Sequence, residues 1–180
     1  KDTSQLFVAG PPVVERGFGR SVDKNTLGGS HIHAHISGAV DNEVESEDDA
    51  FNAIGDFLAF LPCSVYELPP VVPNDDPVDR EDEALLSIIP RDRREMYQVR
   101  EIITSIVDSG SFFEINPGYG QSLVIGLARL AGHSVGIMAN DTHFFGGAVD
   151  ASAAEKMMRF VDLCDTFHIP MINLVDNPGF

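Results

Sequence analysis

Two loops carry the residue types that could hold a ligand. One reads Phe-Phe-Gly-Gly at positions 144–147, and the other reads Asn-Pro-Gly-Phe at positions 177–180. Each follows a short apolar stretch, 134–139 or 171–175, which we interpret as a buried strand. A strand end presents backbone N–H groups, and glycine lets a substrate approach the main chain, although a simple tight turn is the competing interpretation. The candidate binding residues are Phe144, Phe145, Gly146, Gly147, Asn177, Pro178, Gly179 and Phe180.

These two loops could form one pocket. If the strands before them are neighbours, both loops emerge at the same end of the sheet. Aromatic rings there would give flat apolar walls that exclude water from a reacting group. The alternative is that Phe144 and Phe145 fill the core.

A second candidate is the His-x-His-x-His pattern at positions 31, 33 and 35. Strict alternation predicts a strand over residues 30–37 with all three imidazoles on one face, where they could bind zinc or iron. Same-face neighbours on a strand lie about 6–7 Å apart, so three of them rarely converge on one ion. Polar pairing is therefore the default prediction, and a metal-binding module using His31, His33 and His35 stays an alternative.

The charge balance restricts the partners. Among 180 residues, 28 Asp and Glu stand against 12 Lys and Arg, a formal net charge of −16, which argues against a nucleic-acid partner. No apolar run could span a bilayer, and no basic-then-apolar leader opens the chain. Because the chain starts at Lys1 and stops just after a turn signal, we expect an internal piece of a longer protein. Cys63 and Cys164 lie in apolar surroundings, which predicts buried thiols rather than a disulfide.

Hydrophobic periodicity predicts the elements that position these residues. The clearest predicted helix, 46–61, has Ser46 as its N-cap and a core face of Phe51, Ile54, Phe57, Leu58 and Leu61. Further helices are predicted within 92–108 and at 152–167, the latter with the core residues Ala153, Met157, Phe160, Val161 and Cys164. Strands are predicted at 4–9, 112–115, 123–127, 134–139 and 171–175, with the third and fourth forming a hairpin.

A stretch rich in proline and acid, within residues 69–90, predicts a linker between two halves. The second half reads hairpin, helix, strand. This β-β-α order predicts an α/β protein with a crotonase-like spiral.

Several motifs in one order resemble the carboxyltransferase (beta) subunit of biotin-dependent acyl-CoA carboxylases, of the propionyl-CoA carboxylase type. They are LFVAGPPVV (6–14), LGGSHIHAHISG (27–38), DPVDR (76–80), IIPRDRREMYQVREIITSIVDSGSFFEI (88–115), GLARLAGHSVGIMAN (126–140) and RFVDLCDTFHIPMINLVDNPGF (159–180). The resemblance implies a fragment of two crotonase-like domains. Residues 1–73 would end the N-terminal domain, 74–91 would be the linker, and 92–180 would start the C-terminal domain.

The resemblance also implies the chemistry. A carboxyl group would pass from carboxybiotin, carried on a partner domain, to the α carbon of an acyl-CoA, with no metal in this subunit. The glycine turns that stabilise the two oxyanions are expected outside these residues, so no catalytic residue is assigned within them. The pocket of residues 144–147 and 177–180 would hold the biotin ureido ring and the acyl thioester. His33 matches the family's histidine and would order a loop by a hydrogen bond.

The implied partners are a biotin carboxylase and a biotin carrier, in a dimer-based homo-oligomer, a hexamer by resemblance. The implied compartment is the cytoplasm, or the mitochondrial matrix in a eukaryote. Where relatives read Asn-Gln-Pro, this chain has Asn140-Asp141-Thr142, and Asn177 replaces a valine. These departures leave open the acyl group and the direction of transfer. A biotin-dependent decarboxylase alpha subunit, working at a membrane, is therefore an alternative.

Overall fold

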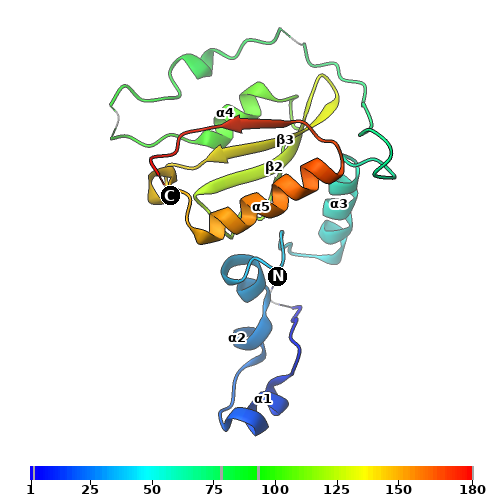
Figure 1. Cartoon of the computed structure of the whole chain (residues 1–180), viewed down its shortest axis with the longest axis vertical. Helices are drawn as coiled ribbons and strands as arrows, with labels where there is room; N and C mark the ends of the chain where they lie inside the picture. The colour runs from blue at the N-terminus through cyan, green and yellow to red at the C-terminus, as the bar shows by residue number, and fades with distance from the viewer. Residues whose placement is uncertain (2, 78, 93, 180) are drawn as a thin grey trace.

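The computed structural model describes residues 1, 3–77, 79–92 and 94–179, and its centre is a four-stranded mixed sheet in the order β1-β2-β3-β4. Figure 1 shows α5 lying across one face of this sheet, while the N-terminal residues extend away from it as an arm. No helix within the described residues combines the length and the apolar character needed to cross a bilayer.

The predicted hairpin is confirmed. β2 (Leu123–Leu130) pairs antiparallel with β3 (His133–Asn140), and β1 (Phe113–Ile115) pairs antiparallel with β2. The turn between β2 and β3 is tight because Ala131 and Gly132 both have positive φ. The carbonyl oxygen of Val72 lies 1.9 Å from where a Cβ on Gly132 would stand, so the preceding chain packs directly on this turn.

Both faces of β2 and β3 are covered, which explains why their sequences are apolar without alternation. On one face Leu123, Ile125 and Leu127 pack with Phe160 of α5 (Ala151–Thr166). On the other face Val124 and Ala128 pack with side chains of α4 (Val99–Ile106), including Ile103.

Helix α5 connects β3 to β4 (Met171–Leu174), which pairs parallel with β3. The carboxylate of Asp150 accepts from the N–H of Ala153 at 2.8 Å and caps the helix. Ala153, Phe160 and Cys164 are buried as predicted and Met157 packs against the same cluster, whereas Val161 is exposed. The prediction that residues 171–175 form a buried strand is wrong in its burial, because β4 is half-buried and Val175 is exposed.

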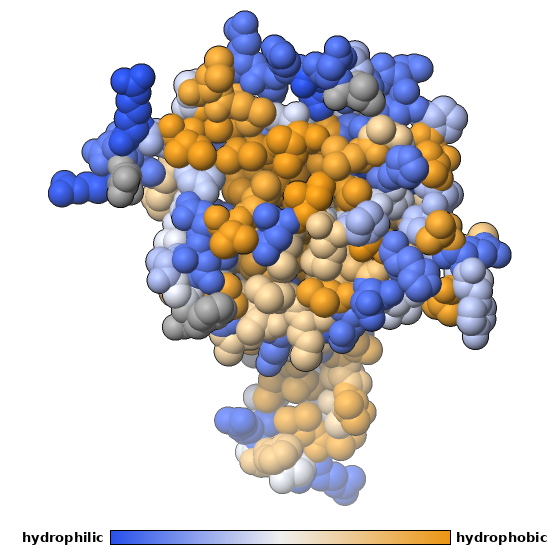
Figure 2. Space-filling view, turned by 45° about the horizontal axis from the view of Figure 1, so that its top comes forward, coloured by the Kyte–Doolittle hydropathy of each residue, from blue (hydrophilic) through white to orange (hydrophobic). Residues whose placement is uncertain are grey.

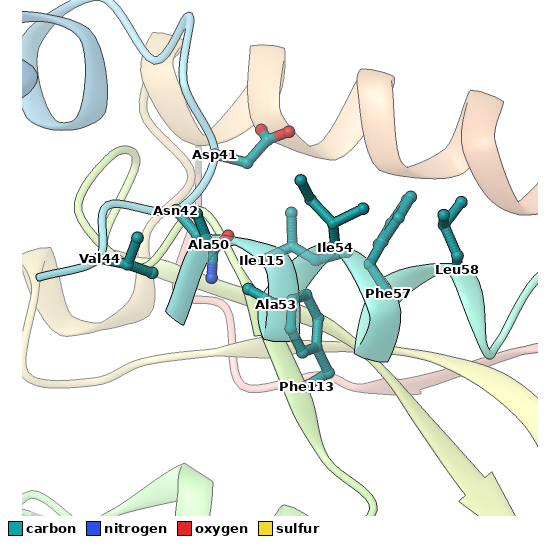
Figure 3. A pocket seen from close by; sticks show the side chains of 10 residues that line it. All are labelled: Asp41, Asn42, Val44, Ala50, Ala53, Ile54, Phe57, Leu58, Phe113 and Ile115. Carbon is teal, nitrogen blue, oxygen red and sulfur yellow. The ribbon is translucent and has the colours of Figure 1, made fainter. Parts of the chain in front are cut away.

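Helix α3 (Glu47–Leu58) begins as predicted, with Ser46 Oγ accepting from the N–H of Asp49 at 3.1 Å. Its predicted core face is wrong in part: Phe57 and Leu61 pack on the core, but Phe51 is 70% exposed and Ile54 and Leu58 are also exposed. Apolar side chains of α3 and β1 line an open groove of about 320 Å³ (Figure 3). The helix is amphipathic as predicted, but only the apolar side chains at its C-terminal end pack against the core.

The arm contains α1 (Pro11–Phe18), α2 (Lys24–Gly28) and the π-helical turn η1 (Ile32–Ile36). The predicted strand at 4–9 is wrong, because only Gln5 forms a bridge, with Gly29. Leu6, Val8, Val13 and Phe18 are exposed, and Figure 2 shows apolar surface on this part of the molecule.

Between α3 and α4 the chain arcs around the outside of the sheet (Figure 1), and its described residues include the short helix η2 (Glu83–Leu86). Polar contacts attach it to the core: Arg80 Nη2 donates to the carbonyl of Val107 at 2.5 Å, and Asp82 Oδ2 accepts from Ser105 at 2.6 Å. Cys63 in this stretch is exposed, which corrects the prediction of a buried thiol, whereas Cys164 is buried and burial raises the pKa of its thiol to about 11. The division at residues 74–91 remains a prediction.

Candidate active site

The loops that follow β3 and β4 lie side by side. The side chain of Asn140, the last residue of β3, joins them: its amide nitrogen donates to the carbonyl of Gly147 at 2.8 Å, and its oxygen accepts from the N–H of Asp176 at 3.1 Å. The N–H of Val149 also donates to the carbonyl of Gly179 at 3.3 Å. The predicted proximity of the two loops is therefore confirmed, and it follows from the parallel pairing of β3 with β4.

Glycine is required at one point of this junction. Gly147 is buried with φ +85°, and a Cβ there would stand 2.5 Å from the carbonyl oxygen of Asp176. Its neighbour Gly146, also at positive φ, has open space around it. Thus Gly147 allows the two loops to touch, whereas Gly146 serves only the backbone turn.

A cavity of about 580 Å³ opens beside this junction, between the loops and residues 89–92 and 94–97. We name it the loop cavity, and its walls include Tyr97, Thr142, His143, Gly146 and Asp176. Tyr97 closes one side by donating from its hydroxyl to Asp176 Oδ2 at 2.7 Å. Burial and this bond raise the pKa of Tyr97 to about 12.

The structure separates the predicted binding residues. Among those that the structure describes, Gly146 alone lines the loop cavity. Phe145 is 75% exposed and Phe144 is half-buried, so the expected aromatic wall of this cavity is not formed, and Phe145 does not fill the core either. The carboxamide oxygen of Asn177 accepts from the N–H of Gly179 at 2.9 Å, while Pro178 is exposed. Phe180 lies outside the described residues.

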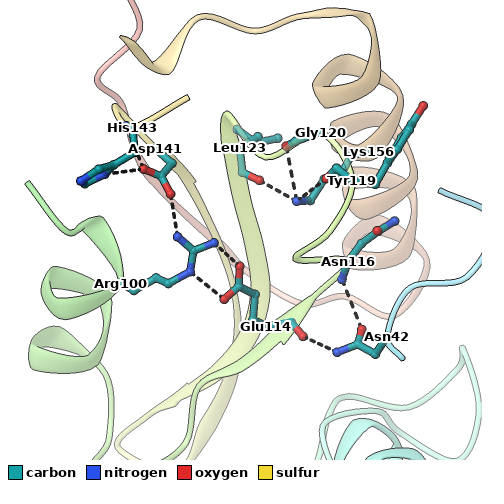
Figure 4. A network of polar contacts seen from close by, with 10 residues as sticks. All are labelled: Asn42, Arg100, Glu114, Asn116, Tyr119, Gly120, Leu123, Asp141, His143 and Lys156. Carbon is teal, nitrogen blue, oxygen red and sulfur yellow. Dashed lines mark hydrogen bonds and ion pairs between the residues drawn. The ribbon is translucent and has the colours of Figure 1, made fainter. Parts of the chain in front are cut away.

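Sequence reasoning missed a charged network (Figure 4) that includes His143, one of the residues lining the loop cavity. Arg100 of α4 makes a bidentate pair with Glu114 of β1, at 2.8 and 2.5 Å, and donates to Asp141 Oδ2 at 2.6 Å. Asp141 Oδ1 in turn contacts Nδ1 of His143 at 3.0 Å and accepts from its backbone N–H at 3.1 Å. A signal was present, because the charged Glu114 interrupts the apolar run Phe-Phe-Glu-Ile and would need a partner if that strand were buried, but the sequence does not identify the partner.

The network keeps Asp141 ionised although it is only 2% exposed. Burial alone would raise its pKa, but hydrogen bonds from Arg100 and His143 outweigh burial and hold the pKa of this carboxyl below its ordinary value. The carboxylates of Glu114 and Asp141 in turn raise the pKa of Arg100. The arrangement presents an oriented imidazole to the cavity.

A second polar centre supports the turn at residues 116–123. Lys156 of α5 is 1% exposed, and its ammonium donates to the carbonyls of Tyr119, Gly120 and Leu123 at 2.9, 3.5 and 2.7 Å (Figure 4). Burial lowers the pKa of Lys156 to about 8. This contact joins the turn before β2 to the helix that leads into β4.

The histidines do not share a face, which corrects the predicted strand. Residues 32–36 form a π-helical turn, so side chains four apart come together while the one between them points elsewhere. His31 and His35 stack with ring centroids 4.8 Å apart, and His35 contacts Glu43 at 2.9 Å. His33 instead donates through Nε2 to the carbonyl of Leu6 at 2.6 Å. Over the described ranges, no three His, Cys, Asp or Glu side chains are grouped as metal ligands.

Comparison with known proteins identifies the family. A family model described as the carboxyl transferase domain matches residues 1–180. Methylmalonyl-CoA decarboxylase subunit alpha of Veillonella parvula is 39% identical over 180 residues, which are 100% of this chain and 35% of that protein. The human mitochondrial propionyl-CoA carboxylase beta chain is 39% identical over 180 residues, 100% of this chain and 33% of that protein.

Solved structures agree. A crystal structure of transcarboxylase 12S, with methylmalonyl-coenzyme A and methylmalonic acid bound, matches with a TM-score of 0.94 at 37% identity, over 99% of this chain and 34% of that one. The predicted crotonase-like α/β fold is thereby confirmed. This chain spans about a third of the length of the relatives it matches. The chain belongs to the carboxyl transferase domain family.

Proposed function

We propose that the protein containing this chain is the carboxyltransferase component of a biotin-dependent acyl-CoA carboxylase. The observation that carries this proposal is the match, over 99% of the chain, to a transcarboxylase structure that binds methylmalonyl-coenzyme A. In the proposed reaction a carboxyl group leaves the biotin ureido nitrogen and bonds to the α carbon of an acyl-CoA, while the α proton goes to that nitrogen.

The residues of the loop cavity are compatible with a neutral ring and a thioester. Gly146, which lines the cavity, has no heavy atom within 4 Å of where a Cβ would stand, so it leaves room for a flat group. Biotin would supply the carboxyl donor. Residues 144–147 and 177–180 would bind and orient the reactants, as the resemblance implies, with Gly146 as the described residue among them that lines the loop cavity. His33 would hold the arm in place through Leu6.

We further propose the domain assignment of residues 1–73, 74–91 and 92–180 given above, with a biotin carboxylase and a biotin carrier as partners. The name of the transcarboxylase structure describes a hexamer assembly, which supports a hexamer here. A cytoplasmic location, or a mitochondrial one as in the human relative's name, completes the proposal.

One observation favours a second candidate. The decarboxylase subunit of Veillonella parvula is as similar to this chain as the human carboxylase chain is, at 39% identity each. A decarboxylase alpha subunit would move the same group in the opposite direction.

The test uses the intact protein assembled with its biotin-bearing partners. Bicarbonate labelled with ¹⁴C should become fixed to an acyl-CoA only when ATP is added, if the protein is a carboxylase. Release of labelled CO₂ from methylmalonyl-CoA without ATP would favour the decarboxylase. If neither reaction is detected with acetyl-, propionyl- or methylmalonyl-CoA, both candidate functions are refuted.

A further inference from the structure

The tautomer of His143 follows from its neighbours. Asp141 is an ionised carboxylate and can only accept, so Nδ1 of His143 carries the proton in the 3.0 Å contact. Nε2 accepts in a second contact, because the group that faces it is an amide nitrogen, which can only donate. Its neighbour is the side-chain nitrogen of Gln98, 3.4 Å away, which is a long contact for a hydrogen bond.

The loop cavity is lined by His143, which carries an oriented acceptor. His143 Nε2 is held in place through Asp141 and Arg100, and Gln98 is only weakly bound to it. The hydroxyl oxygen of the neighbouring Thr142 has no partner within the part of the chain that the structure describes, but it is closed off from solvent and does not face a ligand. An oriented acceptor matches the N–H of an amide or a urea.

The charge of the described lining disfavours another class of ligand. Among the lining residues that the structure describes, Asp92, Glu95 and Asp176 carry negative charge and Arg94 carries positive charge. Such walls repel phosphate groups, which need converging positive charge or helix N-termini. A neutral polar group fits this cavity better than the phosphates of coenzyme A.

We propose that His143, oriented by Asp141, accepts a hydrogen bond from the amide or urea N–H of a reactant in the loop cavity, displacing Gln98. The inference rests on the proposed function for the identity of the reactant. Two sources share this chemistry: the ureido ring of biotin and the pantetheine arm of the acyl-CoA. His143 is then a binding residue and Asp141 a positioning residue.

The test measures Kd by calorimetry on the intact protein, with free biotin and with propionyl-pantetheine, which lacks the phosphates. In His143→Ala, the Kd for one of the two probes should rise about 3- to 10-fold, the usual effect of one hydrogen bond. Whichever probe responds names the source. His143→Gln, whose amide oxygen can accept in place of Nε2, should restore most of the affinity.

Asp141→Asn tests the positioning role separately. In the proposed reaction it should raise the KM for the same reactant and leave kcat within about 2-fold, because the ring loses its fixed tautomer. His133→Gln is the matched control, since His133 is exposed at the opposite end of β3 and should leave both Kd values unchanged.

The possible failures can be told apart. The inference is overturned, even though carboxyl transfer proceeds, if His143→Ala binds both probes with the same Kd as the wild type. It is also overturned if the substitution weakens only the binding of a third probe, adenosine 3′,5′-bisphosphate, which carries the phosphates. If no carboxyl transfer is detected but one probe still depends on His143, the proposed function fails and the binding role of His143 stands.

Discussion

Arg100 of α4 holds the carboxylate of Asp141, the residue that directly follows β3, through a contact of 2.6 Å. This pair connects a helix on one face of the sheet to the loop at the end of its central strand. Because Arg100 also binds Glu114 of β1, one guanidinium fixes three elements around the loop cavity.

Removing that guanidinium should destabilise the protein and disorder the loop. We expect Arg100→Ala to lower the free energy of unfolding by about 2 kcal/mol, less than for a fully buried pair because Arg100 is one-third exposed and partly screened by solvent. Urea unfolding at pH 7 measures this change. Arg91→Ala, at an exposed arginine, should change it by less than about 0.5 kcal/mol.

The pair of Arg100 and Asp141 also makes the stability of the protein depend on pH in the acid range. The pKa of Asp141 is lowered in the folded state, so its stabilisation is present above the unfolded pKa of about 3.9 and is lost as the pH falls through the lower folded value. The gap in stability between the wild type and Arg100→Ala should therefore narrow below about pH 4. A gap that stays constant down to pH 2 would contradict this account.

The neighbouring glycines Gly146 and Gly147 provide a matched comparison. Gly147→Ala should cost at least about 2 kcal/mol, because the added methyl meets the carbonyl of Asp176 and φ is positive. Gly146→Ala should cost only about 1 kcal/mol, since it carries the backbone penalty without a collision. Thermal unfolding of both variants tests the order, and equal losses would mean that the loops are not in contact.

Lys156 should make the protein more stable in mild alkali. Its folded pKa of about 8 lies below the value of 10.5 in an unfolded chain, so the unfolded state binds more protons between these values. The free energy of unfolding should rise by roughly 2–3 kcal/mol from pH 8 to pH 10.5, and the rise should be absent in Lys156→Met. Chemical unfolding of both proteins across this range separates Lys156 from other titrating groups, and parallel curves would show that the ammonium is not desolvated.

Among the histidines we expect the largest functional loss at His33. Its Nε2 bonds the carbonyl of Leu6, 27 residues away in the chain, whereas His31 and His35 stack on each other and only His35 of these two contacts Glu43. His33→Ala should lower kcat/KM for carboxyl transfer by more than His31→Ala does, and added zinc should change neither. Equal losses at both positions would remove the special role of His33.

The strongest predictions from sequence were those in which local pattern and burial agree. The β2–β3 hairpin has two apolar runs around a Gly132 turn, and α5 has both a capping Asp150 and a helical apolar stripe. The His-x-His-x-His segment failed because period two is not unique to strands: between Gly29 and Gly38 the backbone bonds to itself, with the N–H of Ser37 donating to Ile32. The Arg100 network could not be derived, because it joins residues 14 and 41 positions apart through tertiary packing.

The two edges of the sheet differ in how they are protected. The side chain of Asn42 occupies the free edge of β1, donating to the carbonyl of Glu114 at 2.9 Å and accepting from the N–H of Asn116 at 3.2 Å (Figure 4). At the other edge β4 pairs only with β3 among the described strands. When these residues are expressed in isolation, we therefore expect self-association to propagate from β4, and a lysine at the exposed Asn173 to suppress it in preference to any change near β1.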